Sequence, residues 1–102
     1  MTMDPGNSDI LISDVVVSLA GRDRGEYFYV IEADEQYVTL ANGKDRTLEK
    51  PKRKKRKHVE KVLRSETRVA GKIRSGDKVL NGELRRDLAF LSREVQADNR
   101  GG

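Results

Sequence analysis

Alternation of apolar and polar positions in the first half of the chain predicts three consecutive β-strands. Residues 15–19 are rich in valine, residues 27–31 combine aromatic and β-branched side chains, and residues 37–40 alternate. Such side chains fit a pleated, half-buried surface better than they fit a helix. Residues 13–43 therefore predict a small antiparallel meander.

Glycine residues mark the reversals between these strands. Gly21 and Gly25 enclose a charged turn, and both can adopt the positive φ that a tight reversal demands. A second turn is expected at residues 32–35. After the third strand, Asn42 and Gly43 form a dipeptide that favours a type I′ hairpin turn.

The next part of the chain is less regular. Val59, Val62 and Leu63 predict a last strand, although their spacing also suits one helical turn. Residues 65–80 have few large apolar side chains and two glycines, which indicates a linker. The polar N-terminus, residues 1–9, is expected to be a disordered tail.

Leucine spacing near the C-terminus predicts an amphipathic helix over residues 81–97. Asn81 offers an N-cap for this helix. Apolar side chains then recur at i, i+4, i+7 and i+11, as Leu84, Leu88, Leu91 and Val95. Phe90 lies off this stripe, and residues 98–102 form a polar tail.

Charge is distributed in blocks along the chain. Residues 1–43 carry a net charge of −6, residues 44–64 of +8 and residues 65–102 of +2, within an overall charge of +4. Residues 52–57 are six consecutive cations. Adjacent like charges repel one another, and a phosphate backbone would relieve that repulsion and release its condensed counterions. The run therefore predicts a polyanion partner, and the alternatives are a nuclear localisation signal or a solvated surface.

The residues around the first turn resemble the KOW motif, an element of SH3-like barrels in ribosomal proteins and in NusG-type transcription elongation factors. The motif positions are occupied, in order, by Asp14, Val15, Val17, Gly21, Arg24, Gly25 and Val30. Ser13 stands where glycine is common, and Phe28 stands in place of the second glycine. The resemblance implies a mainly β fold, with a small SH3-like (KOW) barrel over residues 10–64 followed by the C-terminal amphipathic helix.

The turn and the basic segment together are similar to a narrower group. LAGRDRGEYFYVIE, followed by NGKDRTLEKPKRKKRKHVEK, resembles the KOW-containing ribosomal protein L14 family of the large subunit in archaea and eukaryotes. Short bacterial KOW RNA-binding proteins are related to that family. The resemblance covers residues 10–62 and implies binding to RNA or to the ribosome, whereas composition alone indicates only a polyanion.

The candidate RNA-binding residues are the cations of the first turn and of the basic segment, residues 44–64. Two arginines on a rigid turn present forked donors to phosphates or exposed base edges, unless Asp23 and Glu26 partly neutralise them. In a strand, three of the cations at residues 52–57 would face one groove, whereas in a flexible loop all could reach phosphates. The full set is Arg22, Arg24, Lys44, Arg46, Lys50, Lys52, Arg53, Lys54, Lys55, Arg56, Lys57 and Lys61, with Asp14, Gly21 and Gly25 as motif residues.

Aromatic residues on the strands allow a base-stacking hypothesis. Tyr27, Tyr29 and Tyr37 are the candidates, although tyrosines that cover a small barrel are more common than stacking platforms. Side-chain alternation places Tyr27 and Tyr29 on one face of the strand and Phe28 and Val30 on the other. We therefore expect one pair in the core and the other pair exposed.

The inventory of reactive side chains argues against an enzyme. The chain has no cysteine and one histidine, and it contains neither a GxSxG nucleophile elbow nor a GxxxxGK[ST] phosphate loop. We expect no catalytic residue, no metal site and no cofactor. His58 either extends the basic segment or is a bystander beside Val59. Because no apolar run approaches the about 18 residues that span a membrane, we expect a cytoplasmic protein, acting as a monomer.

Two functions from different classes fit these observations. The first is an RNA-binding protein that associates with large-subunit rRNA, and with neighbouring ribosomal proteins, through the KOW-like turn and the basic run. The second is a protein-interaction module of the transcription or translation machinery, in which the basic run only steers association. The helix at residues 81–97 either docks its stripe on the strands or lies along a protein or RNA partner through Arg85, Arg86 and Arg93.

Overall fold

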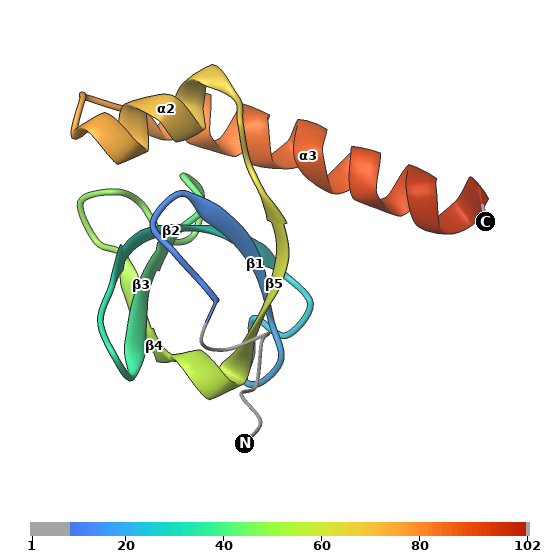
Figure 1. The fold of residues 1–102 in the computed structure, drawn as a ribbon, viewed down its shortest axis with the longest axis horizontal. Helices are drawn as coiled ribbons and strands as arrows, with labels where there is room; N and C mark the ends of the chain where they lie inside the picture. Colours follow the sequence, from blue (N-terminus) through green and yellow to red (C-terminus); the bar gives the residue numbers. More distant parts are fainter. Residues whose placement is uncertain (1–8, 102) are drawn as a thin grey trace.

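A computed structural model describes the backbone of residues 9–101 and the side chains of residues 9–97, so the expected N-terminal tail lies outside the described residues except for Asp9. Figure 1 shows a curved sheet covered on one side by two α-helices. The elements are β1 (Asp14–Ser18), β2 (Tyr27–Ala33), β3 (Tyr37–Ala41), β4 (Lys52–Lys55), the 3-10 helix η1 (Arg56–His58), β5 (Val59–Arg64), α2 (Arg68–Ser75) and α3 (Asn81–Gly101). The expected meander and last strand are confirmed, and the fold is mainly β.

The strands of this part of the chain form one antiparallel sheet in the order β4-β3-β2-β1-β5. The pairing register shifts once between β1 and β5 and once between β2 and β3, and such bulges bend strands. The two edge strands follow each other in sequence and are joined by η1, which fits the strong curl of the sheet in Figure 1. The curl encloses an apolar cluster of Ile10, Val16, Phe28, Val30, Val38, Leu40 and Val59.

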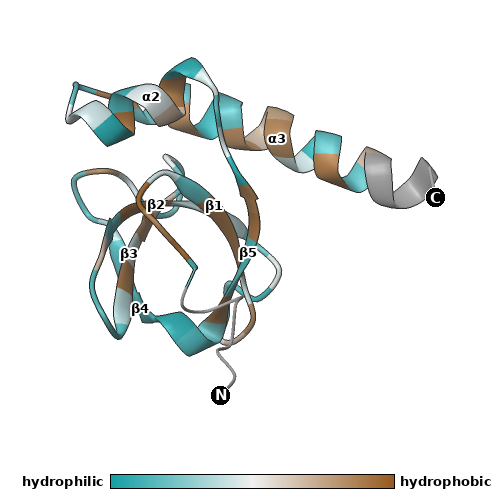
Figure 2. Ribbon diagram, viewed as in Figure 1, coloured by the Kyte–Doolittle hydropathy of each residue, from teal (hydrophilic) through white to brown (hydrophobic). Residues whose placement is uncertain are grey.

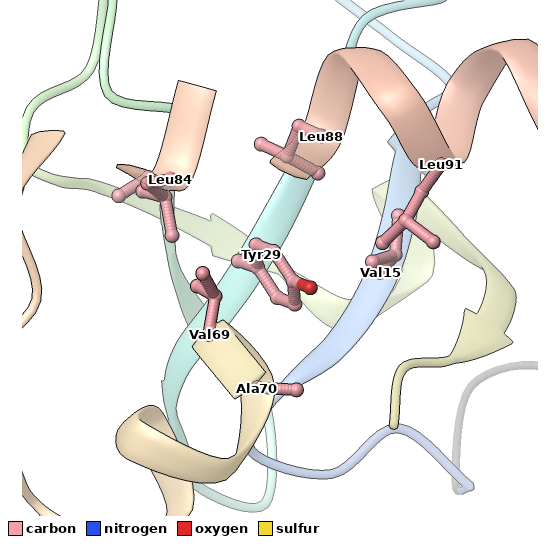
Figure 3. Close-up of a cluster of buried hydrophobic side chains, with 8 residues drawn as sticks. Val15, Tyr29, Val69, Ala70, Leu84, Leu88 and Leu91 are labelled. Carbon is pink, nitrogen blue, oxygen red and sulfur yellow. The ribbon is translucent and has the colours of Figure 1, made fainter. Parts of the chain in front are cut away.

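The two helices cover the other face of the sheet and complete a second apolar cluster. In Figure 2, brown and teal bands alternate along both helices, as expected of amphipathic helices. The cluster consists of Val15, Tyr29, Ala41, Val69, Ala70, Leu84, Leu88 and Leu91, and Figure 3 shows Tyr29 among the side chains of both helices. The expected docking of the α3 stripe on the strands is therefore confirmed, and Phe90 lies off the stripe with 51% of its surface exposed.

The expectation that one face of β2 is exposed is wrong. Phe28 is 1% exposed and Tyr29 is 0% exposed, because the curled sheet encloses one side chain and the helices cover the other. Tyr27 is half-buried against the helix-covered cluster. Neither Phe28 nor Tyr29 therefore has a free ring on which a base could stack.

The expectation of a linker at residues 65–80 is wrong for its central part, which forms α2. The Thr67 hydroxyl caps this helix by accepting a hydrogen bond from the Ala70 N–H at 3.2 Å. Gly76 ends the helix in the left-handed conformation, with a φ of 77°. An N-cap threonine and a C-cap glycine are the sequence features that mark such a short helix.

The C-terminal helix starts at Asn81, as expected, and continues to Gly101, so the tail expected at residues 98–102 is helical as far as Gly101. Glu83 accepts a hydrogen bond from the Leu80 N–H at 3.1 Å, which satisfies a donor at the start of the helix. In Figure 1, α3 extends past the edge of the sheet. None of the helices in the described part of the chain is long and apolar enough to cross a lipid bilayer.

The connection between β3 and β4 differs from the expected two-residue hairpin. Residues 42–51 separate the two strands, and Gly43 has a φ of 77°. Asn81 does not cap its helix as expected, because its side-chain carbonyl accepts a hydrogen bond from the Leu48 N–H at 2.8 Å. The 42–51 loop is thereby attached to the start of α3.

The hydroxyl of Tyr29 lies in a polar cluster between the sheet and the helices. It donates a hydrogen bond to the carboxylate of Asp87 and lies 2.8 Å from Ser65 Oγ. The Thr67 hydroxyl donates to the same carboxylate at 2.8 Å. Burial raises the pKa of Tyr29 to about 12, and the Asp87 carboxylate acts in the same direction. The cluster joins β2, the segment before α2 and α3.

We expect Tyr29→Phe to lower the free energy of unfolding by about 1–2 kcal/mol at neutral pH, because the partly buried Asp87 carboxylate loses a donor. Because the folded-state pKa of Tyr29 is raised, the protonated hydroxyl contributes its full stabilisation below the ordinary tyrosine pKa of about 10. This stabilisation is lost as the pH rises toward 12. The difference between the two proteins in urea denaturation should therefore narrow above about pH 10. A difference that stays constant into strong alkali would contradict this role of the hydroxyl.

Candidate nucleic-acid interface

The turn between β1 and β2 has the geometry that its glycines predict. Gly21 and Gly25 both take a positive φ, of 88° and 90°. The Gly25 N–H donates to the Ser18 carbonyl at 2.8 Å and closes the turn. Arg22 and Arg24 are exposed at its tip. The backbone thus presents both arginines to solvent from a hydrogen-bonded turn.

The other end of β1 is held by charge and by an unusual backbone conformation. Ser13 has a φ of 75°, a region that favours glycine. Its hydroxyl accepts a hydrogen bond from Arg74 at 2.8 Å. Asp14 is fully buried and pairs with Arg64 at 2.8 Å and with Lys61 at 3.4 Å. Asp14 and Lys61 thus stabilise the fold.

Asp23 attaches the first turn to β4. Its two carboxylate oxygens pair with Lys52 at 2.7 Å and with Lys54 at 2.9 Å, and the Ser18 hydroxyl donates to it at 2.7 Å. Lys54 is only 8% exposed and also donates to the Ala20 carbonyl at 2.8 Å. Burial alone would raise the pKa of Asp23, but the hydrogen bonds from Lys52, Ser18 and Lys54 hold it well below its usual range. The carboxylate therefore neutralises lysines of β4, and not the arginines of its own turn.

We expect Asp23→Asn to lower the free energy of unfolding by about 2 kcal/mol near neutral pH, because the buried Lys54 ammonium loses its carboxylate. Because the pKa of Asp23 is lower in the folded than in the unfolded protein, the ionised carboxylate contributes its full stabilisation above about pH 4. This stabilisation is lost as the pH falls through the folded-state pKa. The difference from wild type, measured by circular dichroism in urea, should shrink in acid. Equal stability of the two proteins at neutral pH would contradict the ion-pair role.

The basic run at residues 52–57 forms neither a flexible loop nor one continuous strand. Its first four residues are β4, and its last two begin η1. Strand alternation turns Lys52 and Lys54 toward Asp23, whereas Arg53 lies on the opposite side of the strand. The run therefore does not point its cations into a single groove.

Two arginines of the run are engaged in contacts within the protein. The Arg53 guanidinium lies 3.9 Å from the centre of the Tyr37 ring and pairs with Asp34 at 3.2 Å. Arg56 donates to the carbonyls of Asp34 at 2.7 Å and Ile10 at 3.1 Å. Both arginines stabilise the turn between β2 and β3, and Arg56 also holds the segment before β1.

The other predicted RNA-binding side chains are exposed. Within residues 9–97, none of these seven side chains makes a hydrogen bond or ion pair: Arg22, Arg24, Lys44, Arg46, Lys50, Lys55 and Lys57. Exposed cations without an internal partner can contact phosphates at no cost to the fold. The structure thus separates the predicted set into cations that stabilise the protein and cations that are available to a ligand.

Several of the available cations lie on one surface, together with Lys52, which pairs with Asp23. Arg22, Arg46 and Lys52 line a hollow of about 160 Å³. Lys44 lines a second hollow of about 380 Å³ together with Arg85 of α3. The two hollows share lining residues, so they adjoin. We call the region the turn–loop surface and define it by Arg22, Arg24, Lys44, Arg46 and Lys52.

Carboxylates also line the two hollows of the turn–loop surface. Glu26 and Asp45 belong to both, and Asp23 belongs to the smaller one. These carboxylates repel phosphates, so phosphate contacts fall to the exposed arginine and lysine tips. No three His, Asp or Glu side chains in the described part of the chain lie close enough together to hold a metal ion.

Sequence reasoning did not identify two features of this surface. The sequence shows Asp23 only as a neighbour of Arg22 and Arg24, and its pairing with Lys52 and Lys54 of β4 has no local sequence pattern. Leucine spacing puts Arg85 on the polar side of its helix, but no sequence pattern indicates the second hollow that Arg85 lines. Both features depend on contacts between segments that are far apart in the chain.

No family model matches the chain, and no curated protein sequence matches it. The KOW resemblance therefore rests on the residues of the first turn and the basic segment.

Proposed function

We propose that this protein binds RNA through the turn–loop surface. The observation that carries the proposal is the Asp23 bridge, which holds the first turn against β4 and brings Arg22, Lys52 and Arg46 to one hollow. A rigid framework holds arginine and lysine tips within reach of phosphates, so the backbone loses little conformational freedom on binding. An A-form RNA helix offers mainly phosphates, 2′-hydroxyls and a shallow minor groove, so it suits a surface that recognises charge and shape.

The finer assignment of the fold is part of the same proposal. A curled five-stranded antiparallel sheet, with its edge strands joined by a 3-10 turn, supports an SH3-like barrel of the KOW type. The positive φ of Ser13, Gly21 and Gly25 supports the match to the motif, because these are positions at which the motif has glycine or a glycine turn. We infer from the same resemblance that the RNA is rRNA of the large ribosomal subunit.

The salt dependence of RNA affinity tests the electrostatic part of the proposal. Each phosphate contact contributes about −0.7 to −0.9 to the slope of log affinity against log salt concentration. Four to five contacts therefore predict a slope of roughly −3 to −4.5. Fluorescence anisotropy with a labelled RNA hairpin at several salt concentrations gives this slope. A slope near zero, or no binding at low salt, would refute RNA binding by this surface.

Sedimentation of a native lysate tests the ribosomal part separately. A sucrose gradient probed for this protein should find it in the large-subunit, monosome and polysome fractions at low salt. The fraction bound should fall when the salt concentration is raised. If the protein stays at the top of the gradient but binds hairpin RNA in solution, RNA binding stands and the ribosome is the wrong partner.

A further inference from the structure

The end of the sheet away from the first turn carries a hollow with a different chemistry. It has a volume of about 470 Å³ and is lined by Ile10, Leu11, Ile12, Ala33, Arg56, Arg64 and Arg74. It lies near Asp14, at the start of β1, whereas the turn–loop surface follows Ser18 at the end of that strand. Carboxylates line both hollows of the turn–loop surface, but none lines this one. The lining therefore combines apolar side chains with arginines, and the carboxylates that pair with Arg64 and Arg74 lie outside it.

The apolar part of the hollow stands on a fixed backbone. Leu11 is 52% exposed and Ile12 is 40% exposed, between the buried residues Ile10 and Ser13. The Leu11 N–H donates to the Asp14 carboxylate at 2.8 Å, and the Ser13 N–H donates to a carbonyl of β2 at 2.8 Å. Both side chains line the hollow. Their burial against a partner is favourable because it removes apolar surface from water, and the fixed backbone loses little conformational freedom on binding.

The arginines of the hollow come from three elements and are held in place. Arg64 of β5 pairs with Asp14. Arg74 of α2 donates to Ser13 Oγ at 2.8 Å and to the Ser65 carbonyl at 3.1 Å, and pairs with the exposed Glu66 carboxylate at 3.5 Å. Arg56 of η1 is fixed by carbonyls of the protein. A guanidinium carries five N–H donors, so Arg64 and Arg74 keep donors beyond these bonds. Such anchored guanidiniums can pair with carboxylates in a bidentate manner.

We propose that this hollow binds an acidic segment of a partner protein that carries leucine-like side chains beside its carboxylates. The apolar side chains cover Leu11 and Ile12, and the carboxylates pair with Arg64 and Arg74. An apolar centre with arginines around it is typical of protein interfaces. RNA fits less well, because phosphates would occupy the arginines and leave Leu11 and Ile12 exposed. This site is separate from the turn–loop surface and does not depend on the proposed RNA binding.

A fluorescein-labelled peptide with two central leucines flanked by two glutamates on each side is the probe. We expect it to bind the wild-type protein in fluorescence anisotropy, and we expect matched peptides with glutamine for glutamate, or serine for leucine, to bind at least tenfold more weakly. Leu11→Ser combined with Ile12→Ser should weaken binding of the probe by about tenfold, since both side chains are anchors. Arg64→Lys keeps a cation for Asp14 but loses the paired N–H donors of the guanidinium, so it should weaken binding of the probe severalfold.

The matched control is Leu80→Ser, which removes a leucine that is 56% exposed at the start of α3 and should leave binding of the probe unchanged. The affinity for hairpin RNA should stay at the wild-type level in the Leu11 and Ile12 variant. The proposal is overturned if the wild-type protein does not bind the probe, or if that variant binds it as tightly as wild type. An equal loss of RNA affinity would instead assign this face to RNA and would also overturn it.

Discussion

Gly43→Ala should lower the free energy of unfolding by about 4 kcal/mol and loosen the attachment of α3. Gly43 has a φ of 77°, where a side chain costs about 1–2 kcal/mol. A Cβ atom there would overlap the carbonyl oxygen of Asn81 and lie 3.0 Å from the Arg85 nitrogen. Both are backbone atoms of α3, so the overlap is relieved only if the helix moves away from the 42–51 loop. Urea denaturation gives the loss in stability, and hydrogen exchange of α3 amides reports the movement.

Gly25→Ala is the matched control for this prediction. Gly25 has a φ of 90°, but no atom lies within 4 Å of a Cβ added there. The substitution therefore carries the backbone strain without the overlap, and should cost only about 1–2 kcal/mol. Equal losses for the two alanine variants would show that the loop does not press against α3 as described.

Combined substitution of Arg22, Arg24, Lys44 and Arg46 by glutamine should weaken binding of hairpin RNA by about 100-fold at about 0.1 M salt. These side chains are exposed and without an internal partner among residues 9–97, so the fold should keep its stability. Loss of four phosphate contacts should also make the salt slope shallower by about 3 units. Fluorescence anisotropy over a range of salt concentrations measures both quantities.

The control variant has the same net charge as the first variant, but its four substitutions lie outside the turn–loop surface. Arg68, Lys78, Arg86 and Arg93 are exposed cations of the helical part of the chain, and their combined substitution by glutamine removes the same four charges. We expect this control to lose less than about threefold in affinity, since long-range charge is screened over about 10 Å at 0.1 M salt. Similar losses for the two variants would indicate nonspecific attraction by net charge, and would argue against the turn–loop surface.

The strands and the C-terminal helix could be predicted because their patterns are local. Valine and aromatic runs marked β1 and β2, and the leucine spacing marked the face of α3 that lies on the sheet. The curl of the sheet could not be predicted in this way, since it depends on register shifts between strands. Burial of both Phe28 and Tyr29 follows from that curl and from the helices, so alternation within β2 alone gave the wrong exposure.

The candidate site was predicted in its parts but not in its arrangement. The glycines of the first turn and the exposure of Arg22 and Arg24 follow from the turn sequence. The roles of Lys52 and Lys54 depend on Asp23, about thirty residues earlier, and no sequence pattern connects them. The cations at residues 52–57 are equivalent in the sequence, but the fold pairs Lys52 and Lys54 with Asp23 and leaves Lys55 and Lys57 available to a ligand.

Amide chemical shifts of the ¹⁵N-labelled protein, recorded while hairpin RNA is added at low salt, test the central claim most directly. The account predicts that the shifts change at residues 21–25 and 42–47 and at Lys52, and that residues 10–13 at the other end of the sheet stay unchanged. Absence of shift changes, or changes confined to residues 10–13 and to the arginines around them, would contradict RNA binding by the turn–loop surface.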